Sequence, residues 1–140
     1  MTHRELLDLT AGFLTGDNKL PNSDSICLAL LEDAFIEVAD RASALHLMTL
    51  SADANILRLG LGENYLRFPN LPEDLDDDLD IDHELCGAVS RFIASYVSKE
   101  QEQKHINAAE RRILNYNGKV NEILEKIKAD EENASTTCEA

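Results

Sequence analysis

Apolar residues recur at helical spacing near the start of the chain. Three of them lie three or four positions apart, which places their side chains on one face of a helix: Leu6, Leu9 and Phe13. Thr2 and Glu5 occupy the two positions of a capping box, in which side chains satisfy backbone N–H groups at a helix start. Gly16 then provides a stop signal. The pattern predicts a first helix over residues 2–15.

A longer helix is predicted over residues 23–42, after the turn-forming stretch 16–22 and with Asn22 or Ser23 as its cap. One side of it is apolar: Ile26, Leu30, Phe35, Val38 and Ala42. Further apolar residues widen that side: Leu28, Leu31, Ala34 and Ile36. A wide apolar face indicates burial from several directions, so this helix is predicted to be the central one.

The apolar period changes between residues 45 and 68. Short apolar runs are separated there by Asp, Asn and Gly residues at 51–55 and 62–64, and Pro69 and Pro72 follow. Short runs divided by turn residues are typical of β-hairpins. We therefore expect one or two hairpins in this segment.

A third helix is predicted over residues 82–97. Acidic residues precede it, and Asp80 or Asp82 can cap it because negative charge is favourable at a helix N-terminus. It carries the most regular apolar stripe of the chain: Leu85, Val89, Phe92, Ile93, Tyr96 and Val97. Arg91 is assigned to its polar face, and the stripe predicts that this helix is essential to the core.

The last helix is predicted to begin at a second capping box, Ser98 with Gln101, and to end near Ala129. Apolar residues recur in it at the a/d spacing of a coiled coil: Ile106, Ala109, Ile113, Tyr116, Val120, Ile123 and Ile127. Gly118 predicts a kink or an early end. Packing of this seam inside its own domain is preferred over pairing with another chain.

These elements define a fold class that is mainly α: a small helical bundle with a β-hairpin insertion and a long C-terminal helix. Residues 73–81 are interpreted as a loop that is too charged to pack alone. Residues 1–129 form a single domain in this interpretation. Residues 130–140 form an acidic flexible tail, because their composition cannot support a core.

Charge narrows the range of partners. The chain has 13 basic and 27 acidic residues, a formal net charge of −14 at pH 7. Such a charge repels nucleic acid and anionic lipid at long range. Residues 73–84 hold eight acids and no Lys or Arg, whereas residues 99–128 hold seven bases against five acids. The acidic loop of one molecule is thus suited to contact the basic helix of a neighbour.

An acidic run could suggest a calcium site, since Asp76, Asp78 and Asp80 alternate as at the start of an EF-hand loop. The sixth position, however, is Ile81 where the loop requires Gly. The twelfth is Gly87 where a bidentate Glu is needed. We therefore predict a solvated loop and no calcium site.

No other segment has the spacing of a catalytic, cofactor or metal site. The histidines occur singly: His3, His46, His83 and His105. Gly60-Leu61-Gly62 leads into residues 65–69 in place of a helix, which indicates a hairpin turn and not a dinucleotide fingerprint. No nucleophile elbow is present. The sequence therefore predicts a binding or assembly protein that is not an enzyme, with no catalytic residue, no cofactor and no metal.

The cysteines and the N-terminal residues indicate in which cellular compartment the protein is expected. The three cysteines lie far apart and form no C-x-x-C pair, so reduced thiols are expected: Cys27, Cys86 and Cys138. The first residues lack a basic region followed by an apolar stretch. No uninterrupted apolar run approaches the ~20 residues that span a bilayer. Neither export by a signal peptide nor membrane insertion is expected.

The order of these elements resembles that of the head-to-tail adaptor proteins of tailed bacteriophages, also called connector or neck proteins. The resemblance rests on the end of the hairpin segment, residues 65–72 (YLRFPNLP), and on residues 79–89 (LDIDHELCGAV) followed by 92–97 (FIASYV). The latter combine acidic and apolar positions ahead of an amphipathic helix. The long acidic loop and the acidic tail depart from the family pattern.

The resemblance implies a virion structural protein that is assembled in the host cytoplasm. Such a protein forms a homo-oligomeric ring, a dodecamer in the family, between the portal protein and a downstream neck or tail protein. It lines the channel through which DNA passes without being specifically bound, and no membrane is involved. The resemblance implies no residue-specific site.

Two other functions fit parts of the sequence. The net charge and the 73–84 cluster suit an acidic inhibitor or DNA mimic that binds a basic partner protein. A DNA mimic needs carboxylates in rows over a folded face. In this chain they are concentrated in one loop and the tail, which fits DNA mimicry less well. The seam from Ile106 to Ile127 would suit a small coiled-coil regulator.

Overall fold

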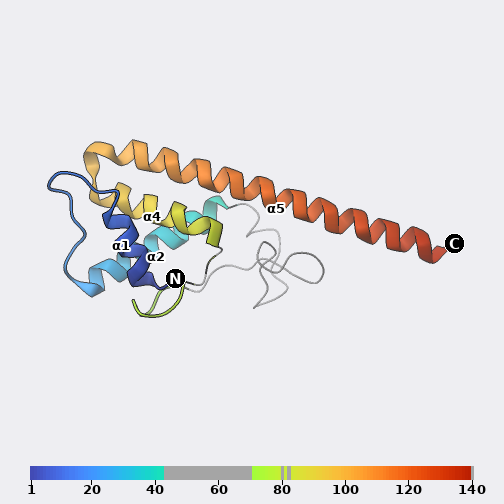
Figure 1. Ribbon diagram of the computed structural model, residues 1–140, viewed down its shortest axis with the longest axis horizontal. Helices are drawn as coiled ribbons and strands as arrows, with labels where there is room; N and C mark the ends of the chain where they lie inside the picture. Colours follow the sequence, from blue (N-terminus) through green and yellow to red (C-terminus); the bar gives the residue numbers. More distant parts are fainter. Residues whose placement is uncertain (43–70, 80, 82, 140) are drawn as a thin grey trace.

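The computed structural model describes residues 1–42, 71–79, 81 and 83–139, and this part of the chain is mainly helical (Figure 1). Its elements follow in the order α1 (His3–Ala11), α2 (Asp24–Arg41), α4 (His83–Val97), the 3-10 helix η2 (Lys99–Gln101) and α5 (Glu102–Glu139). The predicted helical fold class is confirmed to this extent, and the described ranges contain no strand. The hairpins predicted for residues 45–68 lie outside them.

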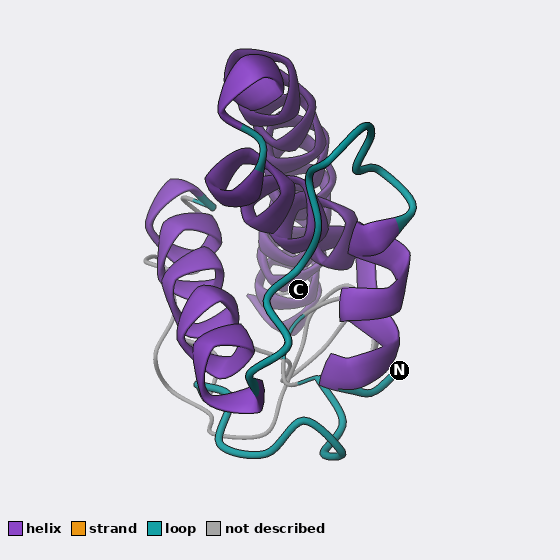
Figure 2. Cartoon of the chain, turned by 90° about the vertical axis from the view of Figure 1, so that its left-hand side faces the viewer, coloured by secondary structure: helices purple, strands orange, loops and turns teal. Residues whose placement is uncertain are grey.

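The central helix is α4, which contacts α1, α2 and α5. Figure 2 shows α1 and α2 on either side of the α4–α5 pair. Side chains all around α4 are buried: Leu85, Cys86, Ala88, Val89, Ser90, Phe92, Ile93, Ala94 and Ser95. Small residues such as Ala88 and Ala94 let neighbouring helices approach closely. The core role predicted from the apolar stripe is confirmed, although Tyr96 at its end is 36% exposed.

The prediction that α2 is the central helix is wrong. This helix, capped as predicted by Ser23, buries a single face: Cys27, Leu31, Ala34, Phe35, Val38 and Ala39. Ile26, which we assigned to that face, is 51% exposed, and Ile36 is 36% exposed. The reason is that α2 packs on one side only, chiefly against α4. Of the further apolar residues, Leu31 and Ala34 are buried in the core, whereas Ile36 lies at the surface.

Helix α1 begins as predicted and ends early. Thr2 and Glu5 form the capping box. The helix stops at Ala11, because from Gly12 onward the backbone continues in tighter i to i+3 turns and Gly disfavours helix. Gly16, predicted to end the helix, instead adopts a left-handed conformation, φ 66°, in the following loop. Leu9, assigned to the apolar face, is 44% exposed.

A buried hydroxyl pair joins α1 to α4. The Thr10 hydroxyl donates to the Leu6 carbonyl at 2.9 Å and lies 2.9 Å from the Ser90 hydroxyl. Thr10 and Ser90 are both fully buried. Because each hydroxyl has a partner, their burial carries little desolvation penalty.

Residues 73–78 pack against the start of α1. From here on, the term acidic loop refers to these residues. The Arg4 backbone N–H donates to the Leu75 carbonyl at 2.9 Å, and the His3 backbone N–H donates to the Asp77 carbonyl at 3.1 Å. Leu75 is 4% exposed and belongs to the core cluster. The segment is a loop as predicted and packs against α1, because it is anchored by its backbone and by one apolar side chain while its acids face outward.

The second predicted capping box is also wrong. The Ser98 side chain makes no capping bond to the backbone at the start of η2. Its hydroxyl instead accepts a hydrogen bond from Asn18 Nδ2 at 3.4 Å, and Ser98 is 1% exposed. Tertiary contact with the loop after α1 thus replaces local capping.

Helix α5 confirms the inward seam and exceeds its predicted length. Buried residues line its N-terminal half at the expected spacing: His105, Ala109, Ile113, Tyr116 and Val120. They pack against α4 and α2, so over this stretch the seam is internal. The helix passes through Gly118 without interruption and reaches Glu139, ten residues beyond the predicted end, because extending a formed helix costs little. Figure 1 shows it continuing well past the bundle. The separate role predicted for residues 130–140 stays a prediction.

Candidate functional site

Three side chains that are distant in sequence meet beside the end of α1: Phe13, Arg91 and His105. Cζ of Arg91 lies 3.8 Å from the centroid of the Phe13 ring, within range of a cation–π interaction. Nη1 of Arg91 is 3.1 Å from Nδ1 of His105. A guanidinium can only donate, so this nitrogen of His105 accepts and carries no proton. The cluster therefore holds a neutral imidazole beside a cation.

Burial sets the electrostatics of this cluster. His105 is 1% exposed. Burial lowers the pKa of His105, and the charges of Arg91 and Lys104 lower it further. Burial also lowers the pKa of Arg91, with a contribution from Arg112. Arg91 Nε and His105 Nε2 are buried without a hydrogen-bond partner in the described part of the chain. Among the described residues, no nucleophile or carboxylate is hydrogen-bonded to either ring nitrogen of His105.

Acidification is expected to destabilise the fold through His105. Because its pKa is lower in the folded than in the unfolded state, the unfolded state binds the extra proton first. The stabilisation is complete above the unfolded value of about 6.5 and declines as the pH falls below it, by at most about 1.4 kcal/mol per pH unit. Thermal melts between pH 7.5 and pH 5 measure the effect.

The control is His105→Asn, which keeps an acceptor near the Nδ1 position and does not titrate. The melting temperature of the parent should fall more steeply with acidification than that of His105→Asn. Equal slopes in the two proteins would contradict the role assigned to His105.

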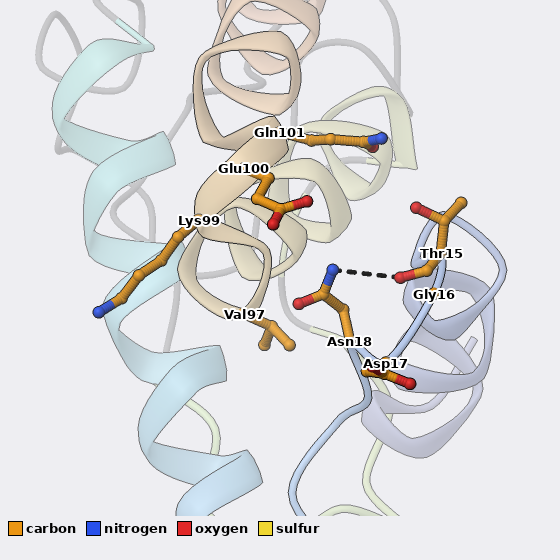
Figure 3. A pocket seen from close by; sticks show the side chains of 8 residues that line it. All are labelled: Thr15, Gly16, Asp17, Asn18, Val97, Lys99, Glu100 and Gln101. Atoms are coloured by element: carbon orange, nitrogen blue, oxygen red, sulfur yellow. Dashed lines mark hydrogen bonds between the residues drawn. The ribbon is translucent and has the colours of Figure 1, made fainter.

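A polar hollow of about 480 Å³ lies between the loop after α1 and the α4–α5 connection (Figure 3). It is lined by Thr15, Gly16, Asp17, Asn18, Val97, Lys99, Glu100 and Gln101. Asn18 Nδ2 donates to the Thr15 carbonyl at 3.1 Å, which fixes the loop side. Figure 3 shows Lys99 directed away from the hollow. The lining offers acids, amides and a hydroxyl, but no buried charged group that would select one ligand.

A second, smaller hollow of about 180 Å³ lies where α2 ends against α5, between Arg41, Glu110, Ile113, Leu114 and Asn117. Arg41 Nη1 forms an ion pair with Glu110 Oε1 at 2.7 Å, and Arg41 Nε forms another with Glu37 at 3.1 Å. The Arg41 guanidinium also lies over Phe92, 5.2 Å from its centroid. Leu114 is 70% exposed.

Tyr96 borders α2 near these groups. Burial raises its pKa to about 12, and the carboxylates of Glu37 and Asp33 contribute. Its hydroxyl therefore stays protonated at neutral pH and is not activated as a base or nucleophile.

Candidates considered from the sequence are placed apart from one another. Asp76 pairs with Arg4 at 2.9 Å, while Asp80 and His46 lie outside the described residues. Nδ1 of His3 donates to the Asp74 carbonyl at 2.8 Å. Cys27 and Cys86 are buried thiols, and burial raises the pKa of Cys27. The described residues contain no cluster of three or more side chains that could hold a metal ion.

The cluster of Phe13, Arg91 and His105 was not predicted from the sequence. Arg91 was assigned to a polar face, yet it is half-buried against Phe13. One signal was available: His105 precedes Ala109 by four positions and so extends the inward seam of α5 by one turn. Nothing in the sequence pairs it with Arg91, because the contact depends on how α4 and α5 pack.

Comparison with models of protein families, with curated proteins and with solved structures finds no match for this chain. Among the helices of the described part, none is long and apolar enough to cross a membrane.

Proposed function

We propose that this protein is a virion structural protein, a head-to-tail adaptor that forms a ring between the portal and the tail and lines the DNA channel. The observation that carries the proposal is the combination of a compact helical bundle with one helix, α5, that extends well beyond it (Figure 1). A ring subunit needs a rigid body for lateral contacts and an element that reaches a neighbouring layer. The bundle and α5 are suited to these two tasks.

Surface properties support an assembly role. Exposed apolar side chains are spread over α2 and α5, among them Ile26, Ile36 and Leu114. Such side chains can be covered when subunits associate. The net charge of −14 suits a channel wall as well, because a negative wall repels DNA and lets it pass without being bound.

Deletion of residues 130–140 tests the proposal. These residues lie beyond Val120, the last seam residue whose burial the structure describes. The deletion is therefore expected to leave the melting temperature of the bundle unchanged. If the end of α5 reaches the portal, the deletion should weaken docking on portal rings by at least tenfold.

Co-sedimentation of the full chain and the deletion variant with purified portal rings of the cognate phage provides the measurement. Leu114→Ser serves as a second variant, because a 70% exposed side chain can be changed without unfolding the bundle. Failure of the full chain to bind portal rings would exclude the adaptor function.

The alternative function is that of an acidic inhibitor that covers a basic protein surface. Exposed acids along α2 favour it: Asp24, Glu32, Asp33 and Asp40. An inhibitor of this kind should compete with DNA for a nucleic-acid-binding protein, in a salt-dependent manner. If this chain captures such a nucleic-acid-binding protein in a pull-down and does not bind portal rings, the result would favour the inhibitor function over the adaptor function.

A further inference from the structure

A stripe of basic side chains runs along one flank of α5, although the chain as a whole is strongly acidic. We call it the basic stripe, and it consists of Lys104, Arg111, Arg112 and Lys119. At 100° per residue these positions fall within about a third of the helix circumference. All of them are exposed. The salt bridges of the described residues involve only Arg4 and Arg41 as cations, so the basic stripe has no acidic partner there.

The positive charges at this flank are also held close to one another. Arg112 lies across Gly87 of α4, and a Cβ atom at Gly87 would come within 2.7 Å of its Nη1. Arg112 thereby approaches Arg91, whose pKa it helps to lower. Like charges repel at this range. An anionic group bound at the basic stripe would relieve that repulsion.

The acidic loop supplies a matching surface. Its backbone is fixed to α1 by the hydrogen bonds that Leu75 and Asp77 accept. Asp77 and Asp78 are exposed, and neither side chain forms a hydrogen bond or ion pair with the described residues. A loop held in place loses little entropy on binding. Its acids therefore form a preorganised anionic patch.

We propose that the basic stripe of one molecule binds the acidic loop of a second copy of this chain. The two surfaces differ, so the contact is heterologous, and repetition leads to a closed ring or an open filament. The inference deepens the proposed function by naming its subunit contact, and it rests on that function only for closure into a ring.

Ionic strength affects this contact in two opposite ways. Two molecules of charge −14 repel each other over long distances at low salt. At about 0.15 M salt the Debye length is about 8 Å, which screens this repulsion more than it screens charges in direct contact. Association should therefore be strongest at intermediate ionic strength and weaken again at high salt.

Paired charge reversals test the contact. Lys104→Glu/Arg111→Glu reverses two of the four charges of the basic stripe and keeps the acidic loop. Asp77→Lys/Asp78→Lys reverses the charge of two acids of the loop and keeps the basic stripe. It spares Asp74 and Asp76, whose side chains make contacts within the chain. In sedimentation velocity near 0.15 M salt, the parent is expected to form assemblies larger than a dimer. Each variant alone should be monomeric, with its self-association weakened at least tenfold.

The mixture of the two variants gives the decisive result. The intact basic stripe of one variant meets the intact acidic loop of the other, and the two altered surfaces now also carry opposite charges. The mixture should therefore assemble, although neither variant does so alone. Controls of equal charge change at other exposed positions, Glu32→Lys/Asp33→Lys and Lys19→Glu/Lys99→Glu, should associate like the parent.

Several outcomes would overturn the inference. They are a monomeric parent at every ionic strength, variants that still assemble, or a mixture that stays monomeric. Binding of a duplex oligonucleotide that depends on Lys104 and Arg111, without any change in self-association, would assign the basic stripe to nucleic acid instead. Self-association of the expected kind without portal binding would leave this inference standing and reject only the adaptor function.

Discussion

Phe92→Ala is expected to lower the melting temperature by more than about 10 °C. Phe92 is 2% exposed on the central helix α4, and Arg41 covers its ring. Truncation of a buried Phe to Ala costs about 3–5 kcal/mol, a large part of the about 5–15 kcal/mol that stabilises a domain. For a chain of this length, each kcal/mol shifts the melting temperature by roughly 3–5 °C. Thermal denaturation followed by circular dichroism measures the shift.

The matched control is Leu114→Ala, an apolar truncation on α5 at a side chain that is 70% exposed. It should shift the melting temperature by no more than about 2 °C. Arg91→Ala is not a suitable control, although the sequence assigns Arg91 to a polar face, because Arg91 contacts Phe13 and His105. If Phe92→Ala melts like the parent, α4 is not the centre of the core.

Leu75→Ala is the second change with a large expected effect, about 2–4 kcal/mol of unfolding free energy. Leu75 is 4% exposed and joins the acidic loop to the core beneath the start of α1. Urea denaturation should show a lower midpoint with a similar slope. The loss would show that the acidic loop stabilises the bundle.

Replacement of the exposed acids of the loop separates the stabilising role of Leu75 from the role of the negative charges. Asp76→Asn/Asp77→Asn/Asp78→Asn should leave the denaturation midpoint nearly unchanged, because these side chains are exposed and single exposed charges contribute little. The same variant should self-associate more weakly. A Leu75→Ala protein as stable as the parent, or a strongly destabilised triple Asn variant, would contradict this division.

Local signals in the sequence were sufficient to predict those features that depend on residues close to one another along the chain. The Thr2–Glu5 capping box, the Ser23 cap and the apolar stripe of α4 are present as predicted. Each depends on residues within one or two helical turns. The internal packing of the α5 seam from Ala109 to Val120 followed from spacing in the same way.

The cluster of Phe13, Arg91 and His105 and the exposed surfaces of the molecule could not be predicted from such local signals. Arg91, a charged residue next to the apolar stripe, is half-buried because Phe13 and His105 come to it from α1 and α5. Leu9 and Ile26, apolar residues at helical spacing, are exposed because none of the described helices covers them. Periodicity gives the face of a helix on which a residue lies, but not what faces it.

The sequence by itself determined that this chain is helical, where most helices begin, and that it carries an uneven negative charge. Only the tertiary structure decided that α4 is central, that the acidic loop is anchored through Leu75, and that His105 lies beside Arg91. The physical reason is range. Capping and periodicity act between residues a few positions apart, whereas burial and charge pairing depend on side chains brought together from distant segments.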